Sequence, residues 1–192
     1  VGLTCNSNIT KLLNIAHEFE CNNLGINTEK KITCNPKLQD YTVHVGLDEF
    51  SKLMSNNVDI VIFAIAGSSP LKLLIDLLSS GKIIGIANKE CIICLGKTFL
   101  DIASKFSTEI IPLDSEHNAL FQLIKNKNKN SIRKYTITAS GGSFFNFNKS
   151  EMEKITPDQA ILHPKWKMGK KISVDSSTLM NKGLEIIEAC IL

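Results

Sequence analysis

The sequence lacks the features of a membrane or secreted protein. No apolar run reaches the roughly 20 residues that a helix needs to cross a bilayer, and Val1 does not open a charged-then-apolar signal peptide. The chain also begins without Met and ends in the apolar, helix-like residues Cys190–Leu192. We therefore expect a soluble protein and interpret the sequence as an internal piece of a longer chain.

A strong charge of one sign and a high density of cysteine are missing as well. The 22 basic and 19 acidic residues are mostly interspersed, so neither nucleic acid nor a membrane is a predicted partner. Six cysteines in 192 residues are sparse for a disulfide scaffold, which favours free thiols in a reducing compartment. Cys91 and Cys94 have metal-type spacing, but no second pair follows, so core packing on a helix is the simpler interpretation.

The sequence does contain short apolar, β-rich runs that alternate with longer helical patterns, which is typical of βαβ units and a parallel sheet. The predicted strands cover residues 59–66, 82–87, 109–113 and 134–139, and the predicted helices cover residues 71–78 and 90–106. The Lys/Asn-rich tract 125–134 is a predicted loop, and the proline-containing segment 156–169 is predicted to be irregular. The fold class is therefore α/β with a Rossmann-like parallel sheet.

Asp114-Ser115-Glu116-His117 directly follows a predicted parallel strand, so its side chains should emerge at the carboxyl end of the sheet. Two carboxylates separated by one residue can reach the same ion, and their oxygens suit Mg²⁺ or Mn²⁺ better than Zn²⁺. The same pattern also fits a helix N-cap, with Asp114 or Ser115 capping and Glu116 favoured by the helix dipole. Spacing alone favours the cap, and His117 adds little to either interpretation.

Three further polar groups have both a structural and a functional interpretation. Asn181, Lys182 and Glu185 share one face of a predicted helix and could hold a phosphate and an ion, or form an ordinary surface ion pair. Ser140-Gly141-Gly142 could be an anion-binding nest or a tight turn. Asp175–Thr178 could contact a ligand or cap the helix that is expected to follow.

Two more segments leave the same choice open. Asn88-Lys89-Glu90 ends a predicted strand and opens a helix, so Lys89 could reach a ligand, or the three residues could simply cap the helix. Trp166 lies in a loop flanked by lysines rather than in an apolar periodic run, which fits a lid over a ligand as well as it fits a core position.

The order of these groups along the chain resembles one known family. The matching blocks are Ala87–Glu90, Pro112–Asn118, Ser140–Gly142, Thr156–Ala160, His163–Ile172 and Val174–Glu185. Each is similar to its counterpart in the deoxyxylulose phosphate reductoisomerases, in the same order and at similar spacing. The resemblance is dense from about Val58 to the end and looser before Ser55.

The resemblance implies roles for individual residues. It implies that the metal ligands are Asp114, Glu116 and Glu185. It implies substrate contacts from Lys89, Ser115, Glu116, Ser140, His163, Ser176, Asn181, Lys182 and Glu185, with Lys89 and Glu116 also catalytic. It implies a flap that contains Trp166 and Met168, and cofactor contacts from Asn8, Asn88, Glu90 and Gly169.

The resemblance also implies an activity, which is NADPH-dependent reductive isomerisation of a ketose phosphate assisted by Mg²⁺ or Mn²⁺. Residues 1–113 would then belong to an NADPH-binding domain and residues 114–192 to an α+β catalytic domain, in a homodimer when the chain is full length. The glycine-rich turn of the family is expected upstream of Val1, and Ser7 stands where many relatives have Lys. A plastid stroma of the apicoplast type or a bacterial cytoplasm is the expected compartment. The alternatives for this chain are a non-catalytic metal- or phosphate-binding remnant and a partial gene model.

Overall fold

A computed structural model describes residues 1–28, 36–54, 58–162 and 169–192. It divides into two compact units, and each is made of two separate stretches of chain. The first unit contains Val1–Ala87 and Thr98–Ile111, and the second contains Asn88–Lys97 and Pro112–Leu192. The predicted residues His163, Trp166 and Met168 lie outside the described residues.

The first unit begins with a three-stranded parallel sheet in the order β1 (Gly2–Cys5), β2 (Asn23–Ile26), β3 (Thr42–Val45). Helix α1 (Ile9–Glu18) joins the first two strands and begins at Asn8, whose side chain accepts a hydrogen bond from the Lys11 amide. The helix buries Ile9, Leu12 and Ala16, which recur at helical spacing on one face. These side chains pack with Leu24 and Ile26 of β2 to form a buried core.

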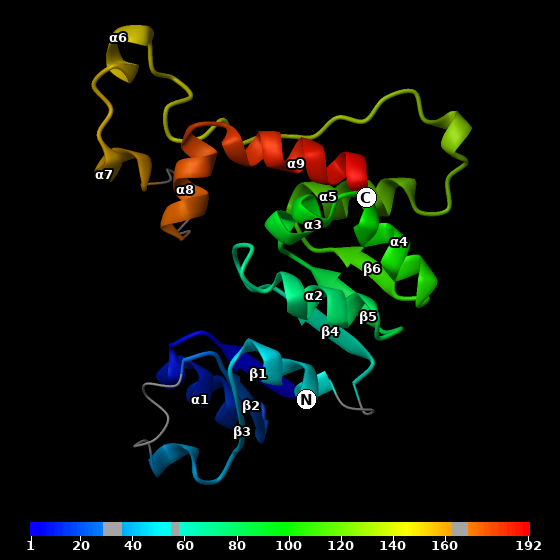
Figure 1. Cartoon of the computed structure of the whole chain (residues 1–192). Coiled ribbons are helices and arrows are strands. Elements are labelled where there is room, and N and C mark those ends of the chain that lie inside the picture. Colours follow the sequence, from blue (N-terminus) through cyan, green and yellow to red (C-terminus); the bar gives the residue numbers. More distant parts are fainter. Residues whose placement is uncertain (29–35, 55–57, 163–168) are drawn as a thin grey trace. The chain divides into compact units, whose positions relative to one another are not determined.

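The same unit contains a second three-stranded sheet in the order β4 (Ile60–Phe63), β5 (Ile83–Ile86), β6 (Glu109–Pro112), and β4 and β5 are parallel. Helix α2 (Leu71–Leu78) lies beside this sheet in Figure 1 and buries four leucines. Short 3-10 helices, η2 (Pro36–Leu38) and η3 (Leu47–Met54), complete the unit together with α4 (Lys97–Lys105). The α/β class and its parallel sheets are confirmed, as is the helix predicted over residues 71–78.

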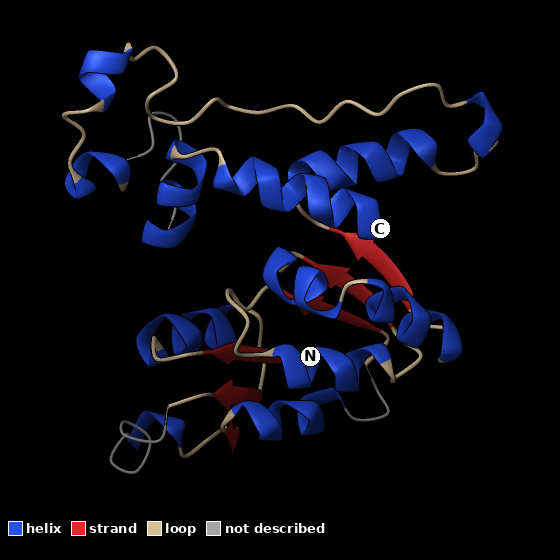
Figure 2. Ribbon diagram, turned by 45° about the horizontal axis from the view of Figure 1, so that its top comes forward, coloured by secondary structure: helices blue, strands red, loops and turns tan. Residues whose placement is uncertain are grey.

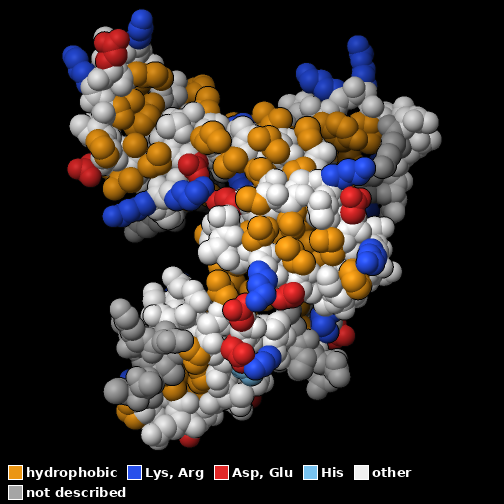
Figure 3. All heavy atoms as spheres, in the orientation of Figure 1, with side chains coloured by type: hydrophobic (Ala, Val, Ile, Leu, Met, Phe, Trp, Pro, Cys, Tyr) orange, Lys and Arg blue, Asp and Glu red, His pale blue; other side chains and the backbone are white. Residues whose placement is uncertain are grey.

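The second unit is built mainly from helices. They are α3 (Lys89–Leu95), α5 (Ser115–Ile124), η4 (Lys129–Ser131), α6 (Lys149–Met152), α7 (Pro157–Ala160), α8 (Lys170–Ser177) and α9 (Met180–Ile191). Helix α9 packs against both α3 and α8. It buries carboxylates, Glu185 and Glu188, and exposes apolar side chains, Ile186 and Ile187. Figure 3 shows hydrophobic side chains gathered along this outer face of α9. The polar face of this helix is therefore the buried one.

Several local predictions were wrong. The helix predicted over residues 90–106 is two helices, because Gly96 adopts a positive φ of 54° and ends α3. No strand forms over residues 134–139, where the described chain provides no pairing partner, and Figure 2 draws this segment as a loop. The segment predicted to be irregular contains α7, which begins with a capping box between Thr156 and Gln159.

The expectations about membrane-spanning segments and cysteines can be compared with the structure. In the described part of the chain, no helix is both long and apolar enough to cross a membrane. The cysteines of that part form no disulfide with one another; they are Cys5, Cys21, Cys91, Cys94 and Cys190. Cys91 is fully buried in α3, and burial raises the pKa of its thiol to about 11, which fits the predicted packing role.

Candidate functional site

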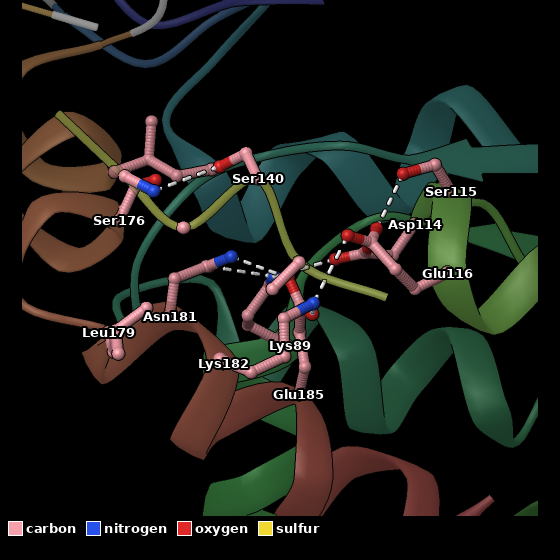
Figure 4. Close-up of a pocket in the computed structure, with 14 residues that line it drawn as sticks. Lys89, Asp114, Ser115, Glu116, Ser140, Ser176, Leu179, Asn181, Lys182 and Glu185 are labelled. Atoms are coloured by element: carbon pink, nitrogen blue, oxygen red, sulfur yellow. Dashed lines mark hydrogen bonds and ion pairs between the residues drawn. The ribbon is translucent and has the colours of Figure 1, made fainter. Parts of the chain in front are cut away.

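Lys89 lies at the centre of a cluster of charged side chains in the second unit. It is the first residue of α3, and its side chain is only 8% exposed. Its ammonium group lies 2.6 Å from Asp114 Oδ2 and 3.1 Å from Glu185 Oε1, and it donates a 2.9 Å hydrogen bond to Asn181 Oδ1. Figure 4 shows these side chains converging from α3, α5 and α9. The cluster therefore joins residues that are up to 96 positions apart in the sequence.

A second lysine completes the cluster. Lys182 Nζ lies 3.1 Å from Glu116 Oε1 and also pairs with Glu185, three residues further along α9. Two ammonium groups thus face three carboxylates, which leaves one excess negative charge in a mostly buried site. Removing a partner from such a cluster would leave an uncompensated buried charge. The predicted surface ion pair between Lys182 and Glu185 does form, but it lies inside this cluster.

Asp114 shows why the capping interpretation was incomplete. It occupies the N-cap position of α5, yet its side chain makes no capping hydrogen bond and instead pairs with Lys89. Burial alone would raise the pKa of Asp114, but His117 and Lys89 outweigh burial and hold that pKa well below its usual range. Burial likewise opposes the charge of Lys89, yet Asp114 and Glu185 raise its pKa, so Lys89 remains an ammonium group.

Carboxylate oxygens of Asp114, Glu116 and Glu185 lie within 4.8 Å of one another. Three hard oxygen donors at this separation fit a divalent cation such as Mg²⁺ or Mn²⁺. The excess negative charge of the cluster favours the same kind of ligand. The residues present therefore fit the cation that the sequence implies.

A pocket of about 180 Å³ opens beside the cluster. It is lined by the six residues just described and by the polar Ser115, Ser140 and Ser176, together with Ala139, Gly141, Gly142, Ile172 and Leu179. Drug-sized ligands usually occupy pockets of roughly 300 Å³ or more, so this one suits a smaller, polar molecule. The predicted metal and substrate residues in the described chain all line this pocket.

The Ser140-Gly141-Gly142 loop closes one side of the pocket because glycine allows a close approach of two backbones. Gly142 has a φ of 75°, and a Cβ atom there would lie 2.4 Å from the Ser176 carbonyl oxygen. Its amide donates a 3.3 Å hydrogen bond to Ser140 Oγ. The Asp175–Thr178 segment lies at the end of α8, and Thr178 Oγ1 accepts a 3.4 Å hydrogen bond from the amide of Met180, the first residue of α9, so the capping interpretation holds in part.

Gly142→Ala is expected to push this loop away from α8. The new methyl group meets backbone atoms, which cannot move aside as a flexible side chain would, so the free energy of unfolding should fall by about 1–3 kcal/mol. Thermal or denaturant unfolding measures the loss. Gly183→Ala is the matched control, because a Cβ atom there meets nothing within 4 Å and alanine favours the helix. Equal stability of the two variants would contradict this account of the loop.

The four predicted cofactor residues make other contacts. Asn8 caps α1 in the first unit, and the Asn88 side chain accepts a 2.6 Å hydrogen bond from the Cys91 amide. Glu90 pairs with Lys171 at 2.8 Å, and Gly169 is the N-cap of α8. None of the four lines the pocket beside the carboxylates. Their role in cofactor binding stays a prediction.

Sequence reasoning missed two buried residues next to the cluster, His117 and Glu188, which are 3% and 1% exposed. The sequence around His117 favours neither a ligand nor a cap, and Glu188 lies outside the motifs that the sequence shows. A signal existed, since Asn181, Glu185 and Glu188 recur at i, i+4 and i+7 and place a polar stripe along one face of α9.

The fold and the site together define an α/β protein with a candidate site for a divalent cation and a small polar ligand. The family model described as 1-deoxy-D-xylulose 5-phosphate reductoisomerase matches residues 1–96, and the model of its C-terminal domain matches residues 110–192. The chain therefore belongs to the 1-deoxy-D-xylulose 5-phosphate reductoisomerase family.

Individual relatives agree with this assignment. The chain is 40% identical to the 1-deoxy-D-xylulose 5-phosphate reductoisomerase of Clostridium perfringens, over 98% of its own length and 51% of that protein. It is 44% identical to the enzyme of Wolbachia pipientis subsp. Culex pipiens, over 98% of its length and 49% of that protein. The chain thus spans about half the length of the curated relatives that it matches.

Solved structures of the family share the fold. A crystal structure of DOX-P reductoisomerase in complex with NADPH, fosmidomycin and magnesium superposes with a TM-score of 0.86 at 35% identity. This match covers the whole of the chain and 50% of that protein. The enzyme from Zymomonas mobilis in complex with NADPH also gives a TM-score of 0.86, at 34% identity, over 98% of this chain and 49% of that one.

Proposed function

We propose that this chain forms the metal site and much of the substrate site of an enzyme that converts 1-deoxy-D-xylulose 5-phosphate to 2-C-methyl-D-erythritol 4-phosphate with NADPH. The observation that carries the proposal is the cluster of Asp114, Glu116 and Glu185, held by two lysines at the edge of a small polar pocket. Family membership supports the reaction, which the relatives' names state for those proteins.

The three carboxylates would hold Mg²⁺ or Mn²⁺, as hard oxygen donors do. The cation, when bound, supplies Lewis-acid stabilisation of negative charge that develops on substrate oxygens. Because carboxylates that bind a cation no longer need both lysines, Lys89 and Lys182 would become available to an anionic substrate. Magnesium in a structure of a relative supports this choice of ion.

Lys89 and the serines of the pocket have distinct tasks in this proposal. Lys89 remains protonated, so it can stabilise an anionic oxygen or donate a proton at Nζ, but it cannot accept one. Ser140, Ser176 and Asn181 line the side of the pocket opposite Ser115, as Figure 4 shows, and offer hydrogen bonds to a phosphate. Anchoring the phosphate away from the reacting carbons would orient the substrate.

NADPH is proposed as the hydride donor on the basis of the family, since two related structures contain it. No Gly-x-Gly-x-x-G turn occurs in the sequence, and the predicted contacts Asn8 and Asn88 cap helices. No step is therefore assigned to the nicotinamide within this chain.

Four finer points also belong to the proposal. The domains would be residues 1–113 for NADPH and 114–192 for metal and substrate, although α3 groups with the second unit. The exposed apolar face of α9 supports further protein contacts, and we propose a homodimer for the full-length form. A plastid or bacterial compartment is proposed, as is the alternative that this chain alone is a non-catalytic remnant or partial gene product.

The full-length form is expected to oxidise NADPH only when both deoxyxylulose phosphate and Mg²⁺ or Mn²⁺ are present, because the substrate must bridge the carboxylate site and the hydride donor. The decrease in NADPH absorbance measures turnover. Omission of each component in turn is the control. Turnover that persists in excess chelator would contradict the metal site. The 192-residue chain by itself is expected to show little or no turnover.

A further inference from the structure

His117 and Glu188 form a buried polar pair next to the carboxylate cluster, and neither lines the pocket. His117 is on α5, three residues after Asp114, and Glu188 is on α9, three residues after Glu185. Each is thus one helical turn from a candidate metal ligand. Charged groups are rarely buried this deeply unless they are paired, so the pair requires a physical explanation.

The hydrogen positions on His117 follow from its neighbours. Nε2 lies 2.9 Å from the Glu185 carbonyl oxygen, which can only accept, so Nε2 carries a hydrogen and donates it. Nδ1 lies 3.6 Å from Glu188 Oε2 and 3.9 Å from Asp114 Oδ1. Among the described residues, neither Nδ1 nor Glu188 Oε2 has a partner within hydrogen-bond distance.

Three sets of lone pairs would meet in this buried space if His117 were neutral and both carboxyl groups were ionised. Such an arrangement is costly, and one additional proton between His117 and Glu188 removes the repulsion. The 3.6 Å approach of His117 Nδ1 to Glu188 Oε2 therefore makes the two side chains a structural pair.

The pair contacts both helices that carry candidate metal ligands, α5 with its N-cap Asp114 and α9 with Glu185. His117 approaches the Asp114 carboxylate through Nδ1 and holds the backbone of α9 at Glu185 through Nε2. Glu188 faces Nδ1 and so favours the ring orientation in which both contacts exist. Partners of this kind, one step behind the ligands, commonly determine how well a site binds its metal.

We propose that Glu188 is a positioning residue, which acts through His117 to fix Asp114 and Glu185 in the arrangement that binds a divalent cation. The inference rests on the proposed metal site and deepens it. It assigns no contact with substrate or ion to Glu188 itself. Asp114, His117 and Glu188 also bring ligand atoms within 4.8 Å of one another, so direct binding of a second cation is the competing explanation that the experiment must separate.

Glu188→Gln tests the proposal, because the amide keeps the size of the side chain but removes the carboxylate that faces Nδ1 of His117. In the full-length form we expect the dissociation constant for Mn²⁺, measured by the loss of the free-ion EPR signal, to rise about 10–100-fold. Turnover should return toward the wild-type kcat at saturating Mn²⁺, since no group that touches the substrate is removed. Glu188→Asp, which keeps a carboxyl group, should bind Mn²⁺ more tightly than Glu188→Gln.

His117→Gln is the second variant, because its amide can still donate to the Glu185 carbonyl but offers no equivalent of Nδ1. Its effect on Mn²⁺ binding and that of Glu188→Gln should not add in the double variant, as expected for residues that act as a unit. Cys190→Ser, at an exposed position of α9, is the control for general disturbance of the helix.

The possible outcomes are distinct. Unchanged Mn²⁺ affinity in folded Glu188→Gln, or additive effects in the double variant, would overturn the proposal. So would two Mn²⁺ ions per wild-type chain that fall to one in Glu188→Gln, because Glu188 would then be a ligand. Failure of the wild type itself to bind Mn²⁺ would instead contradict the proposed function. Circular dichroism and thermal unfolding confirm that each variant is folded.

Discussion

Glu116→Gln is expected to lower NADPH oxidation by the full-length form by about 10²–10³-fold. The amide retains the shape of the side chain but removes one of the three negative charges that face the candidate cation, and it leaves Lys182 with one fewer carboxylate partner. The initial rate of absorbance loss at saturating substrate measures the effect. Mn²⁺ binding, followed by EPR, should weaken in parallel, which would connect the lost turnover to the cation.

Glu153→Gln provides the matched control for Glu116→Gln. The substitution is chemically identical, but Glu153 is exposed at the end of α6 and does not line the pocket. Its turnover and Mn²⁺ affinity should equal those of the wild type. If Glu116→Gln also retained full turnover, the assignment of the carboxylate cluster as the metal site would be wrong.

Lys89→Met is expected to separate catalysis from metal binding. The variant removes the ammonium group between Asp114 and Glu185, so turnover should fall by about 10²-fold while Mn²⁺ still binds, because the carboxylates lose a competing cation. Without metal, the uncompensated carboxylates should lower the free energy of unfolding by about 3 kcal/mol. Addition of Mg²⁺ should restore much of this loss.

Steady-state kinetics and denaturant unfolding with and without Mg²⁺ measure both effects. Lys97→Met is the control, since Lys97 begins α4, is exposed and lies only eight positions from Lys89. Wild-type turnover in Lys89→Met, or a loss of Mn²⁺ binding as large as the loss of turnover, would show that Lys89 does not act as a separate cationic group.

Local sequence patterns predicted the elements of residues 59–87 well because these strands and this helix depend on short-range signals. Four leucines at helical spacing after Pro70 give α2, and the β-branched run around Ile60 gives β4. The secondary-structure predictions failed where the structure depends on residues distant in the sequence or on a single backbone dihedral angle. Residues 134–139 have the composition of a strand, but a strand forms only when a neighbouring strand pairs with it. The end of α3 depends on the positive φ angle of Gly96, which the sequence alone does not give.

The candidate site, too, was predictable from the sequence only in part. Spacing alone favoured a helix cap at Asp114, and only the order of several motifs, through their resemblance to a family, indicated a metal site. No local pattern could predict that Lys89 lies within 3.1 Å of Glu185, because that contact depends on the packing of α3 against α9. The polar stripe that includes Glu188 indicates which face of α9 it occupies, but the spacing does not show that this face is buried.

The chain passes between its two compact units three times, at Ala87–Asn88, Lys97–Thr98 and Ile111–Pro112. A cut at the predicted boundary after residue 113 would therefore leave α3, with Lys89, on the fragment that lacks its carboxylate partners. Neither unit could be exchanged between relatives by a single crossover in the gene without separating this lysine from Asp114 and Glu185. Recombination that preserves the site must transfer at least residues 88–192 together, so we expect this stretch to be inherited as a unit.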